Sequence, residues 1–535
     1  MHKKFLLAVS AILIGGVIAA VVHAYESFQG PTELIQYDPA KASPGYTLFS
    51  PFRGQNTYLI DMQGNVVHYW PYPEGWSAPG SESVEKHARL LRDGTLYRGT
   101  VNRSIPGRRG ATYQQYSWDG ELLWEYAEER PGYNPHHDFV VIWNPKLKQR
   151  TLLYLATKQR THNDVIALGA DPSRSQDYES NPDGIVEVDM DGNVVWEWNI
   201  SDHVVQDFDS SLPNFGVVGE NPGKMDINFS DTGVSGDWIH ANAMDYNQTL
   251  DHIVINNSTH SESYVIDHGA TFVPDDPEAS IALAAGNTGD FLYRWGNSCV
   301  YDAGRCPSVS RDGRTTNHGH QQVFFTHDVQ WIAEQETGTG EPLPGEGNML
   351  IFDNGARRLD TTYSSVIEFN PYDGPMRNGN YVPEARAGYG PGPAPPGGGM
   401  GAGMGMGMGM GGGALVSNQV VWKYQSTLPN SFYSQYISTA QRLPNGNTLI
   451  NSGANGHFFE VTADQEVVWE YINPVGDRTD DAFGVYKIMT DSAGRAFNSV
   501  FKVVRYPLDY PGLAGKDLTP KGPITELWPN EPEAP

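Results

Sequence analysis

Cysteine is almost absent from this chain of 535 residues, which has only Cys299 and Cys306, in the stretch SCVYDAGRC. Their spacing fits no familiar zinc pattern, so a metal site is not expected there. In an oxidising compartment, two cysteines this close together can close a small loop through a disulfide. Two separate thiols are the other interpretation of the same spacing.

Positive charge is scarce as well. Lysine and arginine total 36 against 63 aspartates and glutamates, which gives a formal net charge of −27. An excess of carboxylates repels nucleic acid backbones, and no basic stripe offsets it, so no nucleic acid partner is expected. An anionic substrate would need positive groups or N–H donors placed locally.

Several signature motifs of common enzyme classes are missing. The chain has no G-x-S-x-G elbow and no H-E-x-x-H, which argues against a serine hydrolase or a zinc protease. A Gly-rich segment at 390–414 lacks the lysine and hydroxyl of a phosphate-binding loop, so it does not indicate a nucleotide. We expect a flexible Gly/Met/Pro-rich surface insertion there. The alternative is a soft Cu(I) site formed by its methionines, which are Met400, Met404, Met406, Met408 and Met410.

The N-terminus resembles an export signal. A basic start, MHKK, precedes an apolar run over residues 5–22 and small residues near Ala24. The run is also long enough to remain as a membrane anchor. We therefore predict a signal peptide or signal-anchor helix over residues 1–24 and an exported, periplasmic body. That body is either soluble or anchored to the inner membrane by residues 5–22, its only predicted membrane contact.

Long amphipathic helical patterns are also scarce, and what recurs instead is a turn followed by alternating apolar residues that end in an aromatic. Each copy predicts an outer β-hairpin, and its tryptophans are expected to pack between neighbouring units. The six copies lie at 60–70, 116–126, 188–198, 286–296, 416–424 and 461–471.

A second pattern, strand–turn–strand, precedes most of these copies and predicts an inner hairpin. Two hairpins in series form a four-stranded antiparallel unit, and six such units predict an all-β, six-bladed β-propeller with a central-channel active site. A multi-sheet sandwich is the alternative. The propeller is assigned to residues 25–525, followed by a tail at 526–535. The stretch that begins AFNSVFKVV is expected to supply a closing strand, and residues 27–45 to pair at an edge.

Histidines mark the starts of the inner strands, at His87, His136–His137, His240 and His327. In a propeller these strand starts converge on one mouth of the channel, which favours a shared polar site over independent core histidines. Metal binding is one use for such a cluster. Another is attack by a neutral imidazole on an electrophile, with neighbouring donors stabilising the developing charge. Asp328 is expected to point away from His327 into the blade interface, because successive strand residues face opposite sides.

Four stretches, DWIHANAMDYN, THDVQWI, NMLIFDNG and AQRLPNGNTLI, resemble the bacterial arylsulfate sulfotransferase family. The resemblance implies a six-bladed periplasmic propeller that moves a sulfuryl group from a phenolic sulfate ester to a phenol, independently of the nucleotide sulfate donor. It implies the nucleophile at His327, with His240 and His137 as further catalytic residues and a sulfohistidine intermediate. Substrate binding is assigned to Asn242, Asn354, Arg357 and Thr439, with Ser438 as the alternative to Thr439. The family's disulfide before the nucleophile corresponds to Cys299 and Cys306.

The chain departs from the family at one position. Ser258 stands near the place where the family carries an arginine that binds the sulfuryl oxygens. Arg294, Arg357 or Arg358 are candidates to replace it, and a protonated His260 would be a further cationic donor.

The predicted function is therefore an aryl sulfotransferase acting on a small-molecule aryl sulfate and a phenol, with no cofactor and no metal. The alternative is a non-catalytic envelope β-propeller that binds a ligand or a partner protein. A metal-dependent enzyme using the same histidines is a third interpretation. The sequence leaves open whether the protein is a homodimer.

Overall fold

A computed structural model of the chain describes residues 31–52, 54–72, 87–102, 110–173, 180–229, 236–311, 316–333, 342–372, 380–390, 415–476, 478–480, 486–488 and 498–528. The predicted signal or anchor segment, the Met-rich part of the insertion and most of the predicted tail lie outside these ranges. Within them, no helix combines the length and the apolar character that a membrane crossing requires.

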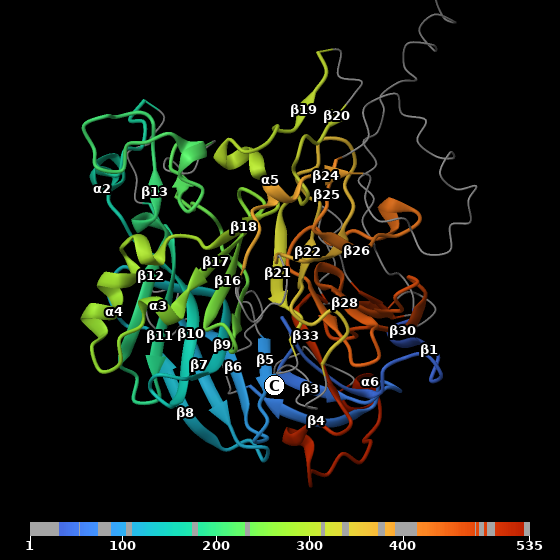
Figure 1. The fold of residues 1–535 in the computed structure, drawn as a ribbon. Coiled ribbons are helices and arrows are strands. Elements are labelled where there is room, and N and C mark those ends of the chain that lie inside the picture. The colour runs from blue at the N-terminus through green and yellow to red at the C-terminus, as the bar shows by residue number, and fades with distance from the viewer. Residues whose placement is uncertain are drawn as a thin grey trace, which may run out of the picture.

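Six antiparallel sheets confirm the predicted six-bladed β-propeller, and their inner strands lie toward the middle of the molecule (Figure 1). In order from the innermost strand, the first three blades are β33 (Val500–Pro507), β2 (Gly45–Pro51), β3 (Asn56–Ile60), β4 (Val66–Pro71); β5 (His87–Leu90), β6 (Leu96–Asn102), β7 (Gly110–Tyr116), β8 (Leu122–Ala127); and β9 (Tyr133–Asn144), β10 (Gln149–Lys158), β11 (Asp183–Asp189), β12 (Val194–Asn199). The other three are β15 (Met244–Asn247), β16 (His252–Asn257), β17 (Glu262–Asp267), β18 (Tyr293–Trp295); β21 (Thr326–Trp331), β22 (Met349–Asp353), β23 (Ser365–Phe369), β26 (Val420–Tyr424); and β27 (Thr439–Arg442), β28 (Thr448–Ser452), β29 (His457–Val461), β30 (Val467–Ile472), β1 (Glu33–Tyr37).

Short elements decorate the blades. The helices are α2 (His162–Ala167), α3 (His268–Thr271), α4 (Pro277–Ala284), α5 (Glu384–Ala387) and α6 (Ile524–Leu527). The two-stranded pairs are β13 (Val204–Val205) with β14 (Met225–Asp226), β19 (Ser308–Val309) with β20 (Thr316–Asn317), β24 (Tyr389–Gly390) with β25 (Val416–Ser417), and β31 (Arg478–Asp480) with β32 (Tyr486–Ile488).

The two ends of the chain close the ring. The C-terminal strand β33 pairs with β2 and becomes the innermost strand of the first blade, which confirms the predicted closing strand. Strand β1 pairs with β30 at the outer edge of the last blade, as predicted for residues 27–45. Radial repetition closed in this way leaves only short, protected sheet edges at the outside of the blades.

Four of the six predicted outer hairpins are hairpins in the structure: β3–β4, β7–β8, β11–β12 and β29–β30. The other two predictions are wrong. Residues 286–296 hold only the outer strand β18, which pairs with β17 after an insertion that carries α3 and α4. Residues 416–424 hold the outer strand β26, which pairs with β23 far upstream. In both blades an insertion separates strands that the pattern had placed in one hairpin.

The tryptophans of the outer hairpins join neighbouring blades, as predicted. The Trp70 indole N–H donates to the Ser117 carbonyl of the next outer hairpin. Trp124 donates in the same way to Met190, Trp422 to Ala463, and Trp469 to Met62. Each aromatic ring thus buries apolar surface between two sheets while its N–H is satisfied by a turn of the next blade.

Carboxylates of the inner strands form a second set of links between blades. Asp138 accepts from the Met244 N–H of the next inner strand, Asp245 from Trp331, and Asp328 from Ala440. Asp328 also lies 3.2 Å from the ammonium of Lys502. Lys502 comes from the first blade, so Asp328 points toward the central channel where these blades meet, and among the described residues it shares no hydrogen-bond partner with His327. The expectation that Asp328 points into a blade interface is therefore wrong, because the strand does not alternate regularly here.

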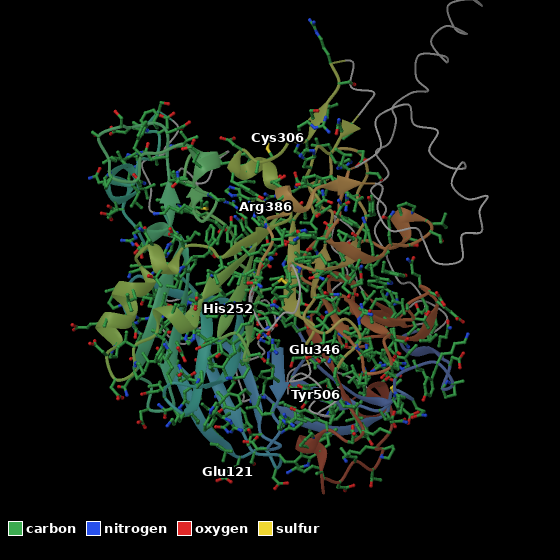
Figure 2. All side chains as sticks on the ribbon, in the orientation of Figure 1. Glu121, His252, Cys306, Glu346, Arg386 and Tyr506 are labelled. Carbon is green, nitrogen blue, oxygen red and sulfur yellow. A yellow bond between two sulfur atoms is a disulfide. The ribbon has the colours of Figure 1, made fainter. Side chains whose placement is uncertain are left out.

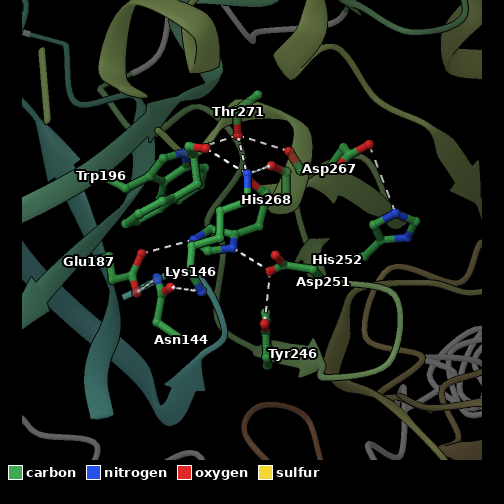
Figure 3. A network of polar contacts seen from close by, with 12 residues as sticks. Asn144, Lys146, Glu187, Trp196, Tyr246, Asp251, His252, Asp267, His268 and Thr271 are labelled. Atoms are coloured by element: carbon green, nitrogen blue, oxygen red, sulfur yellow. Dashed lines mark hydrogen bonds and ion pairs between the residues drawn. The ribbon is translucent and has the colours of Figure 1, made fainter. Parts of the chain in front are cut away.

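A buried charged network joins the third and fourth blades (Figure 3). The ring of His268 lies between Glu187, at 2.9 Å from Nε2, and Asp251, at 2.6 Å from Nδ1. Burial opposes the charged ring, but the two carboxylates outweigh it and raise the pKa of His268 to about 9. The ring is therefore protonated at neutral pH and neutralises a buried acidic pair.

Candidate active site

His327 lies at the start of β21, where the ladder with β22 is irregular between His327 and Gln330. Its side chain is buried. Nδ1 lies 2.7 Å from Oδ1 of Asn354, and the Asn354 amide nitrogen donates at 2.8 Å to the carbonyls of Ser434 and Ile437. Because both amide hydrogens are directed at carbonyls, Oδ1 must be the atom that faces the ring. The hydrogen-bond network therefore assigns the imidazole proton to Nδ1 and the lone pair to Nε2.

The electrostatic setting keeps this imidazole neutral. Burial lowers the pKa of His327 well below its ordinary value and outweighs the opposing hydrogen bond to Asn354, while the nearby His137 and His240 lower it further. A neutral imidazole with its lone pair on Nε2 is the form that can act as a nucleophile. In this structure Nε2 accepts a hydrogen bond from the Ile437 N–H at 3.1 Å.

His137 and His240 face each other across the same mouth of the channel, with ring centroids 4.9 Å apart. Phe325 connects them to the nucleophile candidate: its ring stacks on His240 at 6.3 Å and meets His327 edge-on at 5.6 Å. The structure thus brings together the three histidines that the sequence placed at separate strand starts. His136 adjoins them, with its Nδ1 2.9 Å from Nδ1 of His137 and its Nε2 3.4 Å from Asp183.

Left-handed backbone is concentrated at this mouth. His137, His240, Phe325, Asp328 and Ile437 all have φ between 47° and 60°, although none of them is glycine. Such conformations cost of order 1–3 kcal/mol each and persist only where the surrounding fold imposes them. At His137 and Asp328 they coincide with irregular pairing between the inner strand and its neighbour.

Asn242 and Ser258 lie behind His327. Both are fully buried, and the Asn242 amide donates to Ser258 Oγ at 2.5 Å and to the Thr326 carbonyl at 3.1 Å. Ser258 Oγ donates to the same carbonyl at 2.7 Å. This pair therefore holds the peptide that precedes His327. A substrate contact by Asn242 or Asn354 stays a prediction, because the amide groups of both residues bind protein atoms here.

The candidate cations differ in what surrounds them. Arg294 pairs with buried Glu262, and Arg358 pairs with buried Asp353. Arg357 is exposed, lies with its guanidinium carbon 5.0 Å from the centre of the Phe325 ring, and donates to the Thr259 carbonyl. The expectation that His260 is a cationic donor is wrong, since burial and nearby arginines lower its pKa to about 3. Arg357 is thus the candidate best placed to meet an anion at the mouth.

Thr439 lies in the central channel, among residues of the inner strands. It helps to line a cavity of about 20 Å³ together with Asp328 and Lys502. Its hydroxyl accepts from the Val503 N–H at 3.4 Å. A larger cavity of about 150 Å³, partly lined by Arg89 and Tyr506, lies farther along the channel. Thr439 is thus placed with Asp328 rather than with His327, and a substrate contact by it stays a prediction.

Cys299 and Cys306 form a disulfide, with Cα atoms 4.9 Å apart. The cross-linked loop follows β18 and precedes the strand that carries His327. In Figure 2, Cys306 lies near the top of the view and Tyr506 in its lower half. Across the described ranges, no group of three or more His, Cys, Asp or Glu side chains is arranged to hold a metal ion.

Sequence reasoning missed four residues at or near this site. Asp237 binds the ring of His240, Asp183 lies beside His136, Phe325 connects the histidines, and Lys502 bridges Asp138 and Asp328 at 2.6 and 3.2 Å. Asp237 and Phe325 could have been found from the motifs, because they stand three and two residues before a predicted histidine. Asp183 comes from β11 of the blade that carries His136, and Lys502 comes from the first blade; nothing in their local sequence marks them.

Comparison with known proteins identifies the family of the chain. The protein family described as Arylsulfotransferase (ASST) matches residues 35–370, more than half of the chain. The chain therefore belongs to the arylsulfotransferase family, and this membership supports a sulfotransferase enzyme in general. No curated protein matches the chain.

Similar solved structures include a protein of unknown function from Bacteroides caccae, with 11% identity, a TM-score of 0.36 and coverage of 87% of this chain and 99% of that one. A streptogramin B lyase has 10% identity, a TM-score of 0.33 and coverage of 89% and 93%. Kuenenia stuttgartiensis hydrazine synthase has 10% identity, a TM-score of 0.29 and coverage of 56% and 62%. Likenesses this weak say nothing about activity.

Proposed function

We propose that the protein transfers a sulfuryl group from a phenolic sulfate ester to a second phenol through a sulfohistidine on His327. The observation that carries the proposal is the pairing of His327 with Asn354, which leaves a neutral imidazole with its lone pair on Nε2. Family membership makes a sulfuryl group the electrophile to test first.

The first half-reaction forms a bond between Nε2 of His327 and sulfur, breaks the bond between sulfur and the aryl oxygen, and releases a phenolate. A phenolate is a good leaving group, so the demand on acid catalysis is modest. In the second half-reaction the oxygen of an acceptor phenol attacks sulfur, the N–S bond breaks, and the acceptor gives up its proton.

Attack requires the Nε2 lone pair to be released from the Ile437 N–H. Ile437 has a φ of 47°, which is an unfavourable conformation for a β-branched residue. Relaxation of the peptide before Ile437 toward an ordinary conformation is therefore downhill locally, and it would free the lone pair as the substrate arrives.

Charge on the sulfuryl oxygens needs stabilisation while sulfur is in transit. Arg357 supports this role because it lies at the mouth against Phe325 and is not bound to a buried carboxylate as Arg294 and Arg358 are. We assign to Arg357 the contact that an arginine near Ser258 makes elsewhere in the family.

The test is incubation with 4-nitrophenyl sulfate and a phenol, with release of nitrophenolate as the signal. Mass spectrometry of the protein after donor alone should show one added sulfuryl group on His327. His327→Ala should lose both signals, whereas His252→Ala should keep them, since His252 lies at the opposite end of β16 from Ser258. Silence of the wild type across several donors would favour the non-catalytic propeller instead.

We also propose that this activity is periplasmic, on the basis of the basic and apolar N-terminus. Fractionation of cells that express the full chain tests the location, and a purely cytoplasmic protein would overturn it.

A further inference from the structure

A carboxylate–imidazole pair stands at the mouth beside the nucleophile candidate. Asp237 Oδ2 lies 2.7 Å from Nδ1 of His240. The backbone on both sides of Asp237 is held in place, because the Asn181 N–H donates to the Gly236 carbonyl and Asp183 accepts from the Ile239 and Ala241 N–H groups. The pair is therefore fixed by two chain segments rather than by a mobile side chain alone.

The pair determines which nitrogen of His240 carries a proton. An ionised carboxylate can only accept hydrogen bonds, so Nδ1 must donate and Nε2 becomes the acceptor atom. Burial acts against the ionised form of Asp237, but the hydrogen bond from His240 outweighs it and holds the pKa of Asp237 below its usual value. The carboxylate also favours the imidazolium that forms when Nε2 takes up a proton.

The neighbouring His137 is poorly suited to the same role. Its ring is engaged by His136 at 2.9 Å between the two Nδ1 atoms. Burial and the adjacent His240 lower the pKa of His137 to about 3, which disfavours its imidazolium. The side chain of His240 is 36% exposed, so a proton taken up there can pass to solvent.

The charged groups around His240 are of both signs. Asp183 lies 3.4 Å from Nε2 of His136, and burial together with repulsion from Asp237 raises the pKa of Asp183 to about 7. Arg357 packs on the Phe325 ring and interacts electrostatically with Asp237. His240 therefore has one close carboxylate, Asp237, with a second carboxylate and a guanidinium in the next layer.

We propose that Asp237 is a positioning residue that makes His240 the general base toward the acceptor phenol, a role that rests on the proposed function. In the balanced step, the phenol O–H proton moves to Nε2 of His240 as the phenol oxygen bonds to sulfur and the bond from sulfur to His327 breaks. The electron pair of the N–S bond returns to His327, and His240 then releases its proton to solvent. In the reverse sense, the same imidazolium protonates a weakly acidic leaving phenol.

The test separates the two half-reactions in Asp237→Asn and His240→Gln. With 4-nitrophenyl sulfate as donor, the leaving group needs no proton, so Asp237→Asn should form the sulfohistidine within about 2-fold of the wild-type rate. Transfer to a weakly acidic phenol should fall by about 10²-fold, within the usual contribution of general base catalysis. Transfer to a phenol that is already ionised at the assay pH should be almost unchanged. Asp191→Asn, at an exposed turn of the β11–β12 hairpin, is the matched control.

This dependence on acceptor acidity is one that a merely structural role would not produce. Equal losses for ionised and protonated acceptors, or wild-type transfer in both variants, would overturn the role of Asp237 while leaving the sulfohistidine intact. Failure of the wild type to form a sulfohistidine would overturn the proposed function itself and this inference with it. Because the Asp237 side chain is 56% exposed, its replacement should leave the melting temperature close to that of the wild type.

Discussion

Asn354 accepts the Nδ1 hydrogen of His327 and donates its own two hydrogens to the carbonyls of Ser434 and Ile437. One amide thus joins the nucleophile candidate to the chain segment that leads into β27. It orients the ring, and it also binds the carbonyl of Ile437, the residue whose own N–H meets Nε2. The orientation of His327 therefore depends on contact between two blades.

We predict that Asn354→Ala lowers kcat by about 10²-fold, the usual loss when one preorganised hydrogen bond at a reaction centre is removed. Without the acceptor, His327 is free to adopt the tautomer with its proton on Nε2, which cannot attack. The two carbonyls left unsatisfied should also cost about 1–3 kcal/mol each in stability.

Asn473→Ala is the control for this stability effect. Asn473 is buried and also donates to two backbone carbonyls, those of Val475 and Asn498, and it forms no bond to a histidine. It should lose comparable stability in urea unfolding but retain kcat per folded molecule. If both variants lose kcat equally, Asn354 has no special role in orienting His327.

The sequence was sufficient to predict what repeats. The outer-hairpin pattern recurs with its tryptophan, and histidines recur near the starts of four inner strands, so the propeller and the meeting of His137, His240 and His327 follow from periodicity and family resemblance. Strands β18 and β26 were misassigned because insertions separate them from their partners. The hydrogen bonds of Asn242 to Ser258 and Thr326 could not be predicted from the sequence either, because packing between blades decides which buried amide meets which carbonyl.

The His268 network predicts a loss of stability at alkaline pH. Its folded pKa of about 9 lies above the ordinary value of 6.5, so the stabilisation is complete below pH 6.5 and is lost as pH rises toward 9. The free energy of unfolding of the wild type, measured in urea, should fall over that window. In His268→Gln the free energy of unfolding should be lower at neutral pH, by about 3–5 kcal/mol for a broken buried ion pair. It should also change less with pH across the window. A wild-type stability that does not decline between pH 6.5 and 9 would contradict this assignment.

His260 predicts a loss of stability at acid pH. Its folded pKa of about 3 lies below the ordinary 6.5, so the unfolded state binds a proton first and stability falls as pH drops below 6.5. The His260→Gln variant should show a shallower acid slope than the wild type, by up to about 1.4 kcal/mol per pH unit. His162→Gln, on helix α2, is the control. Parallel acid slopes in wild type and His260→Gln would show that His260 is not buried in its neutral form.

Arg357 gives a prediction about substrate affinity. If its guanidinium contacts the sulfuryl oxygens, Arg357→Ala should raise KM for the sulfate ester by about 10- to 100-fold, as expected for a charge-assisted hydrogen bond of roughly 1.5–3 kcal/mol. Arg357→Lys should recover part of the loss, because an ammonium keeps the charge without the planar fork. Arg386→Ala, an exposed arginine on α5, is the control and should behave as wild type.

Salt dependence distinguishes a direct contact of Arg357 from an indirect one. The affinity of the wild type for the anionic donor should weaken as ionic strength rises, because exposed charges are screened over about 8–10 Å. That dependence should be reduced in Arg357→Ala and retained in Arg386→Ala. If Arg357→Ala lowers kcat but leaves both the donor KM and its salt dependence unchanged, the guanidinium acts through its packing on Phe325, and the sulfuryl oxygens are held by another donor.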